Sequence, residues 1–234
     1  MDYRDECKQD RRDLSFFLLL IGLPLLFVLS PQGLISNPLL RMLTAFFIMP
    51  GFMLGAVLIP FSVKRKEPLL KELGFQPVRK ADFLAALLMI PLFFVSVLIS
   101  LAAKFLGVPL GPQKIAAFAS DCPGWVFLVV LFTAGVLAPI AEELAFRRVI
   151  YDTVKEYAPR KKYVPAVITS LVFALSHGII WQSVILFFLA LILQWQCGKG
   201  SLTRSVLMHA SFNWCSLVIL ILGRCGMFPE TIGG

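Results

Sequence analysis

Seven apolar segments divide this chain, and several of them approach the length of about 20 residues that spans the hydrocarbon core of a bilayer. They cover residues 14–30, 42–63, 82–106, 124–150, 163–178, 180–196 and 203–222. Backbone groups within lipid must pair with one another, and no segment alternates with a period of two, so the segments are predicted to be helices. Hydrophobic residues make up 58% of the 234 residues, whereas a soluble domain is nearer half. We therefore predict an all-α fold, a polytopic transmembrane bundle of about seven helices that forms a single domain over residues 1–234.

The basic residues are distributed in a way that predicts the orientation of the bundle. Of the 22 lysines and arginines, 18 lie before the first segment or near the connections that follow the second, fourth and sixth segments. Seven helices place these regions on one side, and basic loops mark the cytoplasmic side. We expect a cytoplasmic N-terminus, and an integral, multi-pass protein of a prokaryotic plasma (inner) membrane. The net charge of +8 is then explained by topology, so the predicted partners are membrane lipids and not nucleic acid; the oligomeric state is not predicted.

Two acidic side chains and both histidines lie inside the apolar segments and away from their ends, where a charge is costly. Among the fourteen acidic residues, only Glu142 and Glu143 lie away from loops and helix ends, and the chain's two histidines, His177 and His209, both lie in apolar segments. Ionisable groups at membrane depth face the interior of a bundle and mark functional sites. We therefore expect these side chains to meet in a pocket that is reached from the cytoplasm.

Helical spacing separates the two glutamates. Glu143 and Arg147 are four residues apart and share a helix face, so they are predicted to form a supporting ion pair. Glu142 points about 100° away from Glu143 and is free to face a cavity. Pro139 lacks an N–H, so it frees a backbone carbonyl one turn before this pair.

The other two segments supply the remaining groups. Phe173 and His177 are four residues apart, so the phenyl ring can pack against the imidazole, and His209 and Asn213 share one face of the last helix. A carboxylate, two imidazoles and an amide suffice for peptide hydrolysis. Glu142 is the predicted general base for water, and His209 and Asn213 are the predicted donors to the oxyanion. His177 either orients the water or protonates the leaving amine.

These residues resemble the motifs of the CPBP (CAAX protease and bacteriocin-processing) family of intramembrane proteases, which includes the type II CAAX prenyl endopeptidases. The family pattern EExxxR, FxxxH and HxxxN is complete and in order at 142–147, 173–177 and 209–213. The resemblance implies an intramembrane endopeptidase whose catalytic helices lie within 124–222 and whose substrate is a membrane-associated protein or peptide. It also implies the catalytic roles given above, with Glu143, Arg147 and Phe173 as structural support. It does not imply a prenylated substrate, because bacterial relatives serve other ends.

Alternatives to this interpretation remain open at the level of sequence. Glu142, His177 and His209 are also a possible ligand set for a divalent metal such as Zn²⁺, although no HExxH motif is present. We favour a glutamate mechanism without a cofactor. A non-catalytic membrane binding or immunity protein of the same fold, or a proton-coupled transporter, would also carry buried ionisable groups, although the chain lacks the repeats that transporters often show.

Overall fold

The computed structural model describes residues 3–28, 37–63, 67–108, 122–177 and 180–227, and all regular structure in these ranges is helical. Seven long helical segments and one short helix are present within them. They are α1 (Tyr3–Val28), α2 (Pro38–Ser62), the short α3 (Leu69–Glu72), α4 with α5 (Lys80–Leu87 and Met89–Phe105), a composite helix over Gly124–Tyr157, α10 (Val164–Leu175), α11 (Ile180–Lys199) and α12 (Leu202–Arg224). The composite helix consists of α7 (Gly124–Phe132), η1 (Thr133–Leu137), α8 (Ala138–Glu143), η2 (Leu144–Ile150) and α9 (Tyr151–Tyr157). The prediction of an all-α helical bundle is confirmed.

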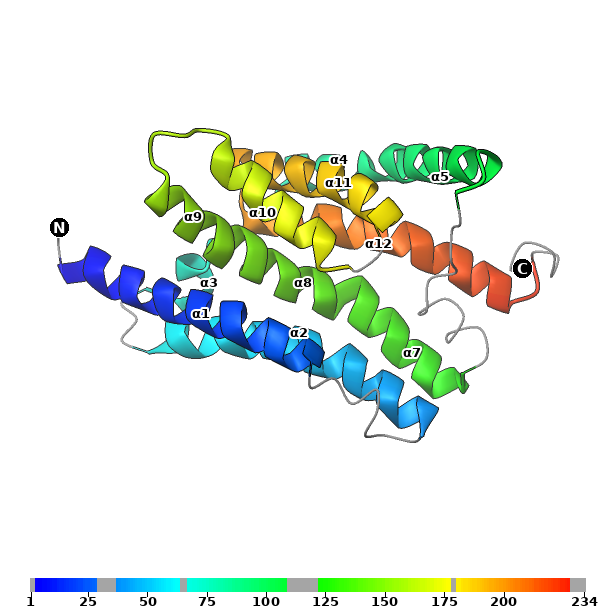
Figure 1. Cartoon of the computed structure of the whole chain (residues 1–234), viewed down its shortest axis with the longest axis horizontal. Helices are drawn as coiled ribbons and strands as arrows, with labels where there is room; N and C mark the ends of the chain where they lie inside the picture. Colours follow the sequence, from blue (N-terminus) through cyan, green and yellow to red (C-terminus); the bar gives the residue numbers. More distant parts are fainter. Residues whose placement is uncertain (1–2, 29–36, 64–66, 109–121, 178–179, 228–234) are drawn as a thin grey trace.

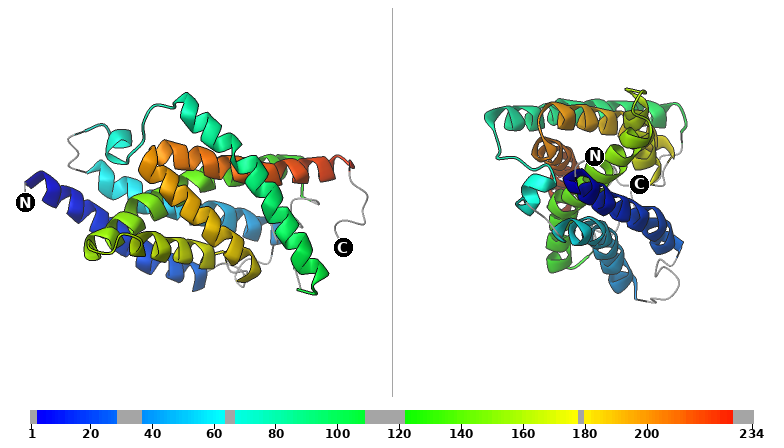
Figure 2. Two further views of the ribbon diagram at one scale, coloured as in Figure 1. Left: turned by 90° about the horizontal axis from the view of Figure 1, so that it is seen from above. Right: turned by 90° about the vertical axis from the view of Figure 1, so that its left-hand side faces the viewer.

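The composite helix forms the centre of the bundle. It runs between the pair α1–α2 and the group α10–α12, while α4 and α5 lie at the outer edge and pack on α12 (Figures 1 and 2). Its side chains supply much of the main core, in which Phe146, Val149 and Ala141 are buried against Val57 of α2 and Phe173 of α10. The central position of this helix explains why its residues are accessible to groups from both sides of the bundle.

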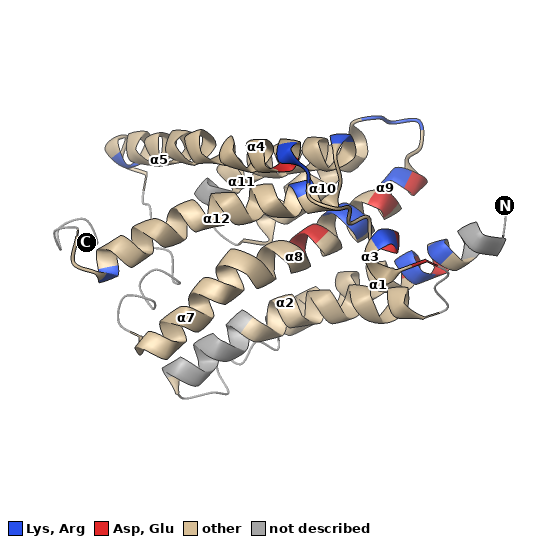
Figure 3. Ribbon diagram, turned by 180° about the vertical axis from the view of Figure 1, so that it is seen from behind, with Lys and Arg blue, Asp and Glu red and all other residues tan. Residues whose placement is uncertain are grey.

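The surface of the bundle is divided by polarity along its length. Figure 3 shows that most of the charged residues gather at the end where the N-terminus lies, and that long stretches of the helices carry none. Three stretches of the described chain are long and apolar enough to cross a membrane: Lys80–Phe105, Gly124–Tyr157 and Leu202–Arg224. Large apolar side chains such as Leu98 and Leu128 are exposed on these helices, which is expected of a surface that faces lipid.

The charged end of α1 differs from the sequence prediction. The apolar pattern predicts a helix from residue 14, but α1 begins at Tyr3. Arg11 lies in this extension, and its guanidinium pairs with Glu72 at 2.9 Å, while Arg12 pairs with Glu156. These contacts to distant parts of the chain stabilise a polar helical turn that hydrophobic periodicity does not reveal.

A strap at residues 67–79 holds the beginning of α12 in place. The backbone amide of Leu202 donates to the Gly74 carbonyl at 3.3 Å, and the Thr203 hydroxyl accepts from the Gln76 amide at 2.9 Å. Gly74 has a φ of +91°, which is a left-handed conformation that glycine adopts without strain. The strap therefore fixes the position of α12 along its axis, and with it the height of the polar groups on that helix.

Candidate active site

The helix that carries Glu142 contains a backbone irregularity that docks α12. In η1 the amide of Ala138 bonds to the carbonyl of Thr133, five residues earlier, as in a π-helix. The next residue in this pattern is Pro139, which has no N–H to give to the Ala134 carbonyl. The side-chain amide of Asn213 donates to that carbonyl at 2.9 Å. The proline thus frees a carbonyl, as its sequence predicts, and Asn213 satisfies it from the neighbouring helix.

Glu143 is the centre of a buried polar cluster behind the site. Its side chain is fully buried, and it forms the ion pair predicted from the spacing with Arg147, whose Nε donates at 3.0 Å. The carboxylate also accepts a hydrogen bond from the Ser205 hydroxyl and one from His209 Nδ1 at 3.0 Å. Sequence reasoning missed Ser205; the available signal was its position four residues before His209, on the same face of α12. The Glu143 carboxylate therefore joins the central helix to α12 through two donors, the Ser205 hydroxyl and His209 Nδ1.

The contact with Glu143 determines which nitrogen of His209 faces the cavity. An ionised carboxylate only accepts hydrogen bonds, so the proton on this side of the ring is assigned to Nδ1. The opposite nitrogen, Nε2, lies 3.7 Å from Glu142 Oε2. Within the described part of the chain, that glutamate oxygen accepts no hydrogen bond. The Glu142 carboxylate is therefore available to a bound water or substrate.

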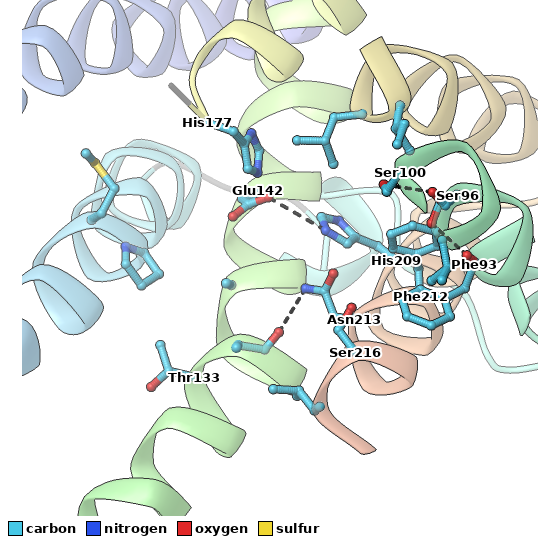
Figure 4. Close-up of a pocket in the computed structure, with 18 of the residues that line it drawn as sticks. Phe93, Ser96, Ser100, Thr133, Glu142, His177, His209, Phe212, Asn213 and Ser216 are labelled. Atoms are coloured by element: carbon cyan, nitrogen blue, oxygen red, sulfur yellow. Dashed lines mark hydrogen bonds and ion pairs between the residues drawn. The ribbon is translucent and has the colours of Figure 1, made fainter. Parts of the chain in front are cut away.

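His177 approaches Glu142 from the other side. It lies just beyond the end of α10 at Leu175, whereas the apolar pattern predicts a helix to residue 178. Its Nδ1 bonds to the Phe173 carbonyl at 2.8 Å, so this ring, like that of His209, keeps Nε2 free for the cavity. Figure 4 shows the His177 ring pointing toward Glu142.

Phe173 separates and orients the two histidines. Its ring centroid lies 4.9 Å from that of His177 and 5.8 Å from that of His209. It is also stacked edge-on against Phe146 at 5.0 Å and lies under the Arg147 guanidinium at 5.2 Å. A fully buried ring with contacts on all sides leaves little freedom for either imidazole to rotate.

Glu142, His177, His209 and Asn213 all line one cavity of about 640 Å³ (Figure 4). Its remaining walls come from α2, α5, η1, α8, α11 and α12 and are mostly apolar, with hydroxyl groups interspersed. They are formed by Met49, Pro50, Met53, Phe93, Ser96, Val97, Ser100, Leu101, Thr133, Ala134, Ala138, Ile185, Leu186, Phe212, Ser216 and Leu217. A carboxylate, two imidazole Nε2 atoms and an amide thus meet in an apolar chamber large enough for a peptide segment.

Glu142, His177 and His209 are also the predicted ligands of the metal alternative. Both histidines present Nε2 while Nδ1 is held by an acceptor, which is how metal-bound histidines are commonly supported. However, across the described residues no group of three His, Cys, Asp or Glu side chains is placed to hold a metal ion. Glu142, His177 and His209 therefore do not form a metal site in this arrangement of side chains, and the metal alternative stays a prediction that experiment decides.

The part of the chain that contains the cavity's ionisable groups is similar to a known protein family. The family model for type II CAAX prenyl endopeptidase Rce1-like proteins matches residues 124–215. No curated protein and no solved structure matches the chain. The matched segment begins with α7, ends within α12 and contains all of the cavity's ionisable groups. Over residues 124–215 this chain is therefore similar to type II CAAX prenyl endopeptidase Rce1-like proteins, and the match supports the resemblance to the CAAX protease and bacteriocin-processing family.

Proposed function

We propose that the chain is an intramembrane endopeptidase that hydrolyses a peptide bond with water activated by Glu142. The observation that supports this most strongly is the cavity that Glu142 shares with His177, His209 and Asn213. Glu142 Oε2 is without a hydrogen bond from any described residue, His209 Nε2 lies 3.7 Å from it, and the His177 ring points toward Glu142 (Figure 4). Peptide hydrolysis needs a base for the water, donors for the oxyanion and a proton for the leaving amine, and these four groups supply all three.

The first half of the reaction forms the tetrahedral intermediate. Glu142 takes a proton from water, and the resulting hydroxide attacks the carbonyl carbon of the scissile bond. The Asn213 amide nitrogen carries two hydrogens and gives one to Ala134, so the second is available to the oxyanion. His209 presents Nε2 to the same space, because its Nδ1 proton is used in the bond to Glu143, and a proton taken up from solvent at Nε2 makes it the second donor to the oxyanion.

The second half breaks the C–N bond. The leaving amine takes the proton that Glu142 removed from water. The His177 ring points toward the carboxylate (Figure 4), and in the proposal its Nε2 orients the water and relays that proton. The products are a carboxylic acid and an amine, and the carboxylate of Glu142 is restored. No covalent enzyme intermediate is required.

The surface and the cavity walls indicate where the protein lies and what it cleaves. We assign it to a membrane as a multi-pass protein, with the charged end of the bundle and the N-terminus on the cytoplasmic side, because this end carries most of the basic residues. The substrate is a membrane-associated protein or peptide, since the cavity walls are largely apolar. A prenyl group on the substrate is not required by any feature of these walls.

Purified protein in detergent, incubated with a peptide library, tests the proposal. Glu142→Gln keeps the shape of the side chain but removes the base, so cleavage should fall by about 10²- to 10⁴-fold. Glu67→Gln is the matched control, because Glu67 forms an exposed ion pair with Lys71 away from the cavity. Cleavage by Glu142→Gln at the wild-type rate would refute the role of Glu142, and binding of peptides without cleavage by the wild type would favour a binding protein.

A chelator arm of the same assay addresses the metal alternative. A glutamate mechanism predicts that cleavage by the wild type is unchanged after dialysis against a strong chelator. Loss of cleavage that returns on addition of Zn²⁺ would instead favour Glu142, His177 and His209 as metal ligands.

A further inference from the structure

We propose that Ser205 is a positioning residue that acts through Glu143 to fix the tautomer and orientation of the His209 ring. Ser205 is fully buried on α12, and its hydroxyl donates to Glu143 Oε2. His209 Nδ1 lies 3.0 Å from the other oxygen of the same carboxylate, Oε1. The catalytic readout of this inference rests on the proposed function, but the contact between the three side chains does not.

The geometry of the helix makes the arrangement specific. Ser205 and His209 are four residues apart on α12 and therefore reach the central helix from one face. Arg147 supplies the second donor to each oxygen of Glu143, with Nε at 3.0 Å from Oε2 and Nη2 at 3.5 Å from Oε1. Each carboxylate oxygen thus has one donor from its own helix and one from α12, which prevents rotation of the carboxylate plane.

The Ser205 hydroxyl has one proton and two acceptors within reach. The second acceptor is the Leu193 carbonyl of α11 at 3.4 Å, which is farther away than the Glu143 oxygen and uncharged. A hydrogen bond to an ionised acceptor is roughly twice as strong as one to a neutral acceptor, so the proton is assigned to Glu143. Ser205 therefore donates its hydrogen bond to the Glu143 carboxylate, which also binds His209.

The tautomer of His209 decides what its Nε2 offers to Glu142. With the proton on Nδ1, the neutral ring presents Nε2 to the cavity as an acceptor, so Glu142 stays free to take a proton from water before Nε2 takes up the solvent proton with which it donates a hydrogen bond to the oxyanion. If the carboxylate rotates and the proton moves to Nε2, the neutral ring presents a donor toward Glu142 Oε2, now 3.7 Å away, and an approach of a few tenths of an ångström would form a hydrogen bond that occupies the proposed base. Loss of the Ser205 hydroxyl should therefore lower turnover more than substrate binding.

The chain's two histidines make the tautomer directly measurable. Protein labelled with ¹⁵N-histidine gives imidazole NMR signals from His177 and His209 alone, and a His177→Ala variant assigns them. In the wild type at several pH values, we expect neutral His209 to carry its proton on Nδ1. Ser205→Ala should give a mixture of tautomers, while Ser205→Thr, which retains the hydroxyl, should restore the wild-type signals. Ser205→Cys provides a second variant of similar size if Ser205→Ala does not fold.

Kinetics on the same variants separate positioning from general stability. Ser205→Ala should lower kcat by about 10- to 100-fold with a change in KM of less than about twofold, and Ser205→Thr should recover most of the loss. Ser211→Ala is the matched control, because Ser211 is also on α12 but donates to the Ala86 carbonyl of α4 at 2.8 Å. It should leave both the NMR signals and the kinetics unchanged.

The outcomes distinguish this inference from the proposed function. If Ser205→Ala leaves the His209 signals unchanged, the inference is overturned whether or not turnover falls. A change in tautomer together with no cleavage by any variant, the wild type included, would support the positioning role and refute the endopeptidase.

Discussion

Replacement of Arg147 by methionine tests how strongly the buried cluster behind the site depends on charge compensation. Both side chains of the Arg147–Glu143 pair are fully buried, and the substitution leaves the Glu143 carboxylate in the core without its cation. Removing one partner of such a pair costs about 3–5 kcal/mol of unfolding free energy. The hydrogen bonds from Ser205 and His209 remain, so we expect a loss at the lower end, about 3 kcal/mol.

The double variant Glu143→Gln/Arg147→Met isolates the charge. A glutamine is neutral, and its carbonyl oxygen still accepts a hydrogen bond from His209 or from Ser205. The cost of the unpaired charge disappears, so the double variant should recover about 1–2 kcal/mol relative to Arg147→Met alone. The remaining loss reflects the guanidinium contact with the Phe173 ring at 5.2 Å and the bonds that are not replaced.

Unfolding by increasing mole fraction of SDS in mixed micelles, followed by circular dichroism, measures these free energies. Arg148→Met is a suitable control, because Arg148 is partly exposed and pairs with Asp152 outside the cluster. The reasoning would be refuted if Arg147→Met lost less than about 1 kcal/mol, or if the double variant were less stable than the single one.

Two further predictions concern the docking of α12 on the central helix, and both use the same unfolding assay. Asn213→Leu should lower the free energy of unfolding by about 1–3 kcal/mol because it leaves the Ala134 carbonyl unpaired. The loss should be smaller in a Pro139→Ala background, where a backbone N–H is restored. Equal losses in the two backgrounds would contradict the assignment of that carbonyl. Gly135→Ala places a Cβ 2.7 Å from the Trp214 ring and should lower the free energy of unfolding by about 1–3 kcal/mol. Trp214→Leu in the same protein should remove most of this loss. A Gly135→Ala protein of wild-type stability would refute the close packing of the two helices.

The helices of this protein follow from its sequence because each depends on a local property. Length and apolarity predict the seven segments, and all seven correspond to observed helices. The Glu143–Arg147 pair and the Phe173–His177 contact follow from the helical period alone, since residues four apart share a face. The freed carbonyl near Pro139 is equally local, because it depends only on the missing N–H.

The errors lie where distant parts of the chain intervene. The beginning of α1 at Tyr3 depends on ion pairs of Arg11 and Arg12 with residues far along the chain. The chain leaves α10 after Leu175, so His177 is held by a turn and by its bond to the Phe173 carbonyl rather than by a continuing helix. Hydrophobic pattern contains no information about either contact.

The sequence by itself determined which ionisable residues lie inside apolar segments and which of them share a helix face, because their spacing along each helix is fixed by its period. Only the tertiary structure decided how they face one another: that Glu143 holds His209 as well as Arg147, that Ser205 joins them, and that Asn213 reaches the Ala134 carbonyl. These relations depend on the rotation and height of α12 against the central helix. The rotation and height are set by the strap at residues 67–79 and by the packing of the Trp214 ring on Gly135. Both are contacts between residues far apart in the sequence, which the helical preference of each segment does not determine.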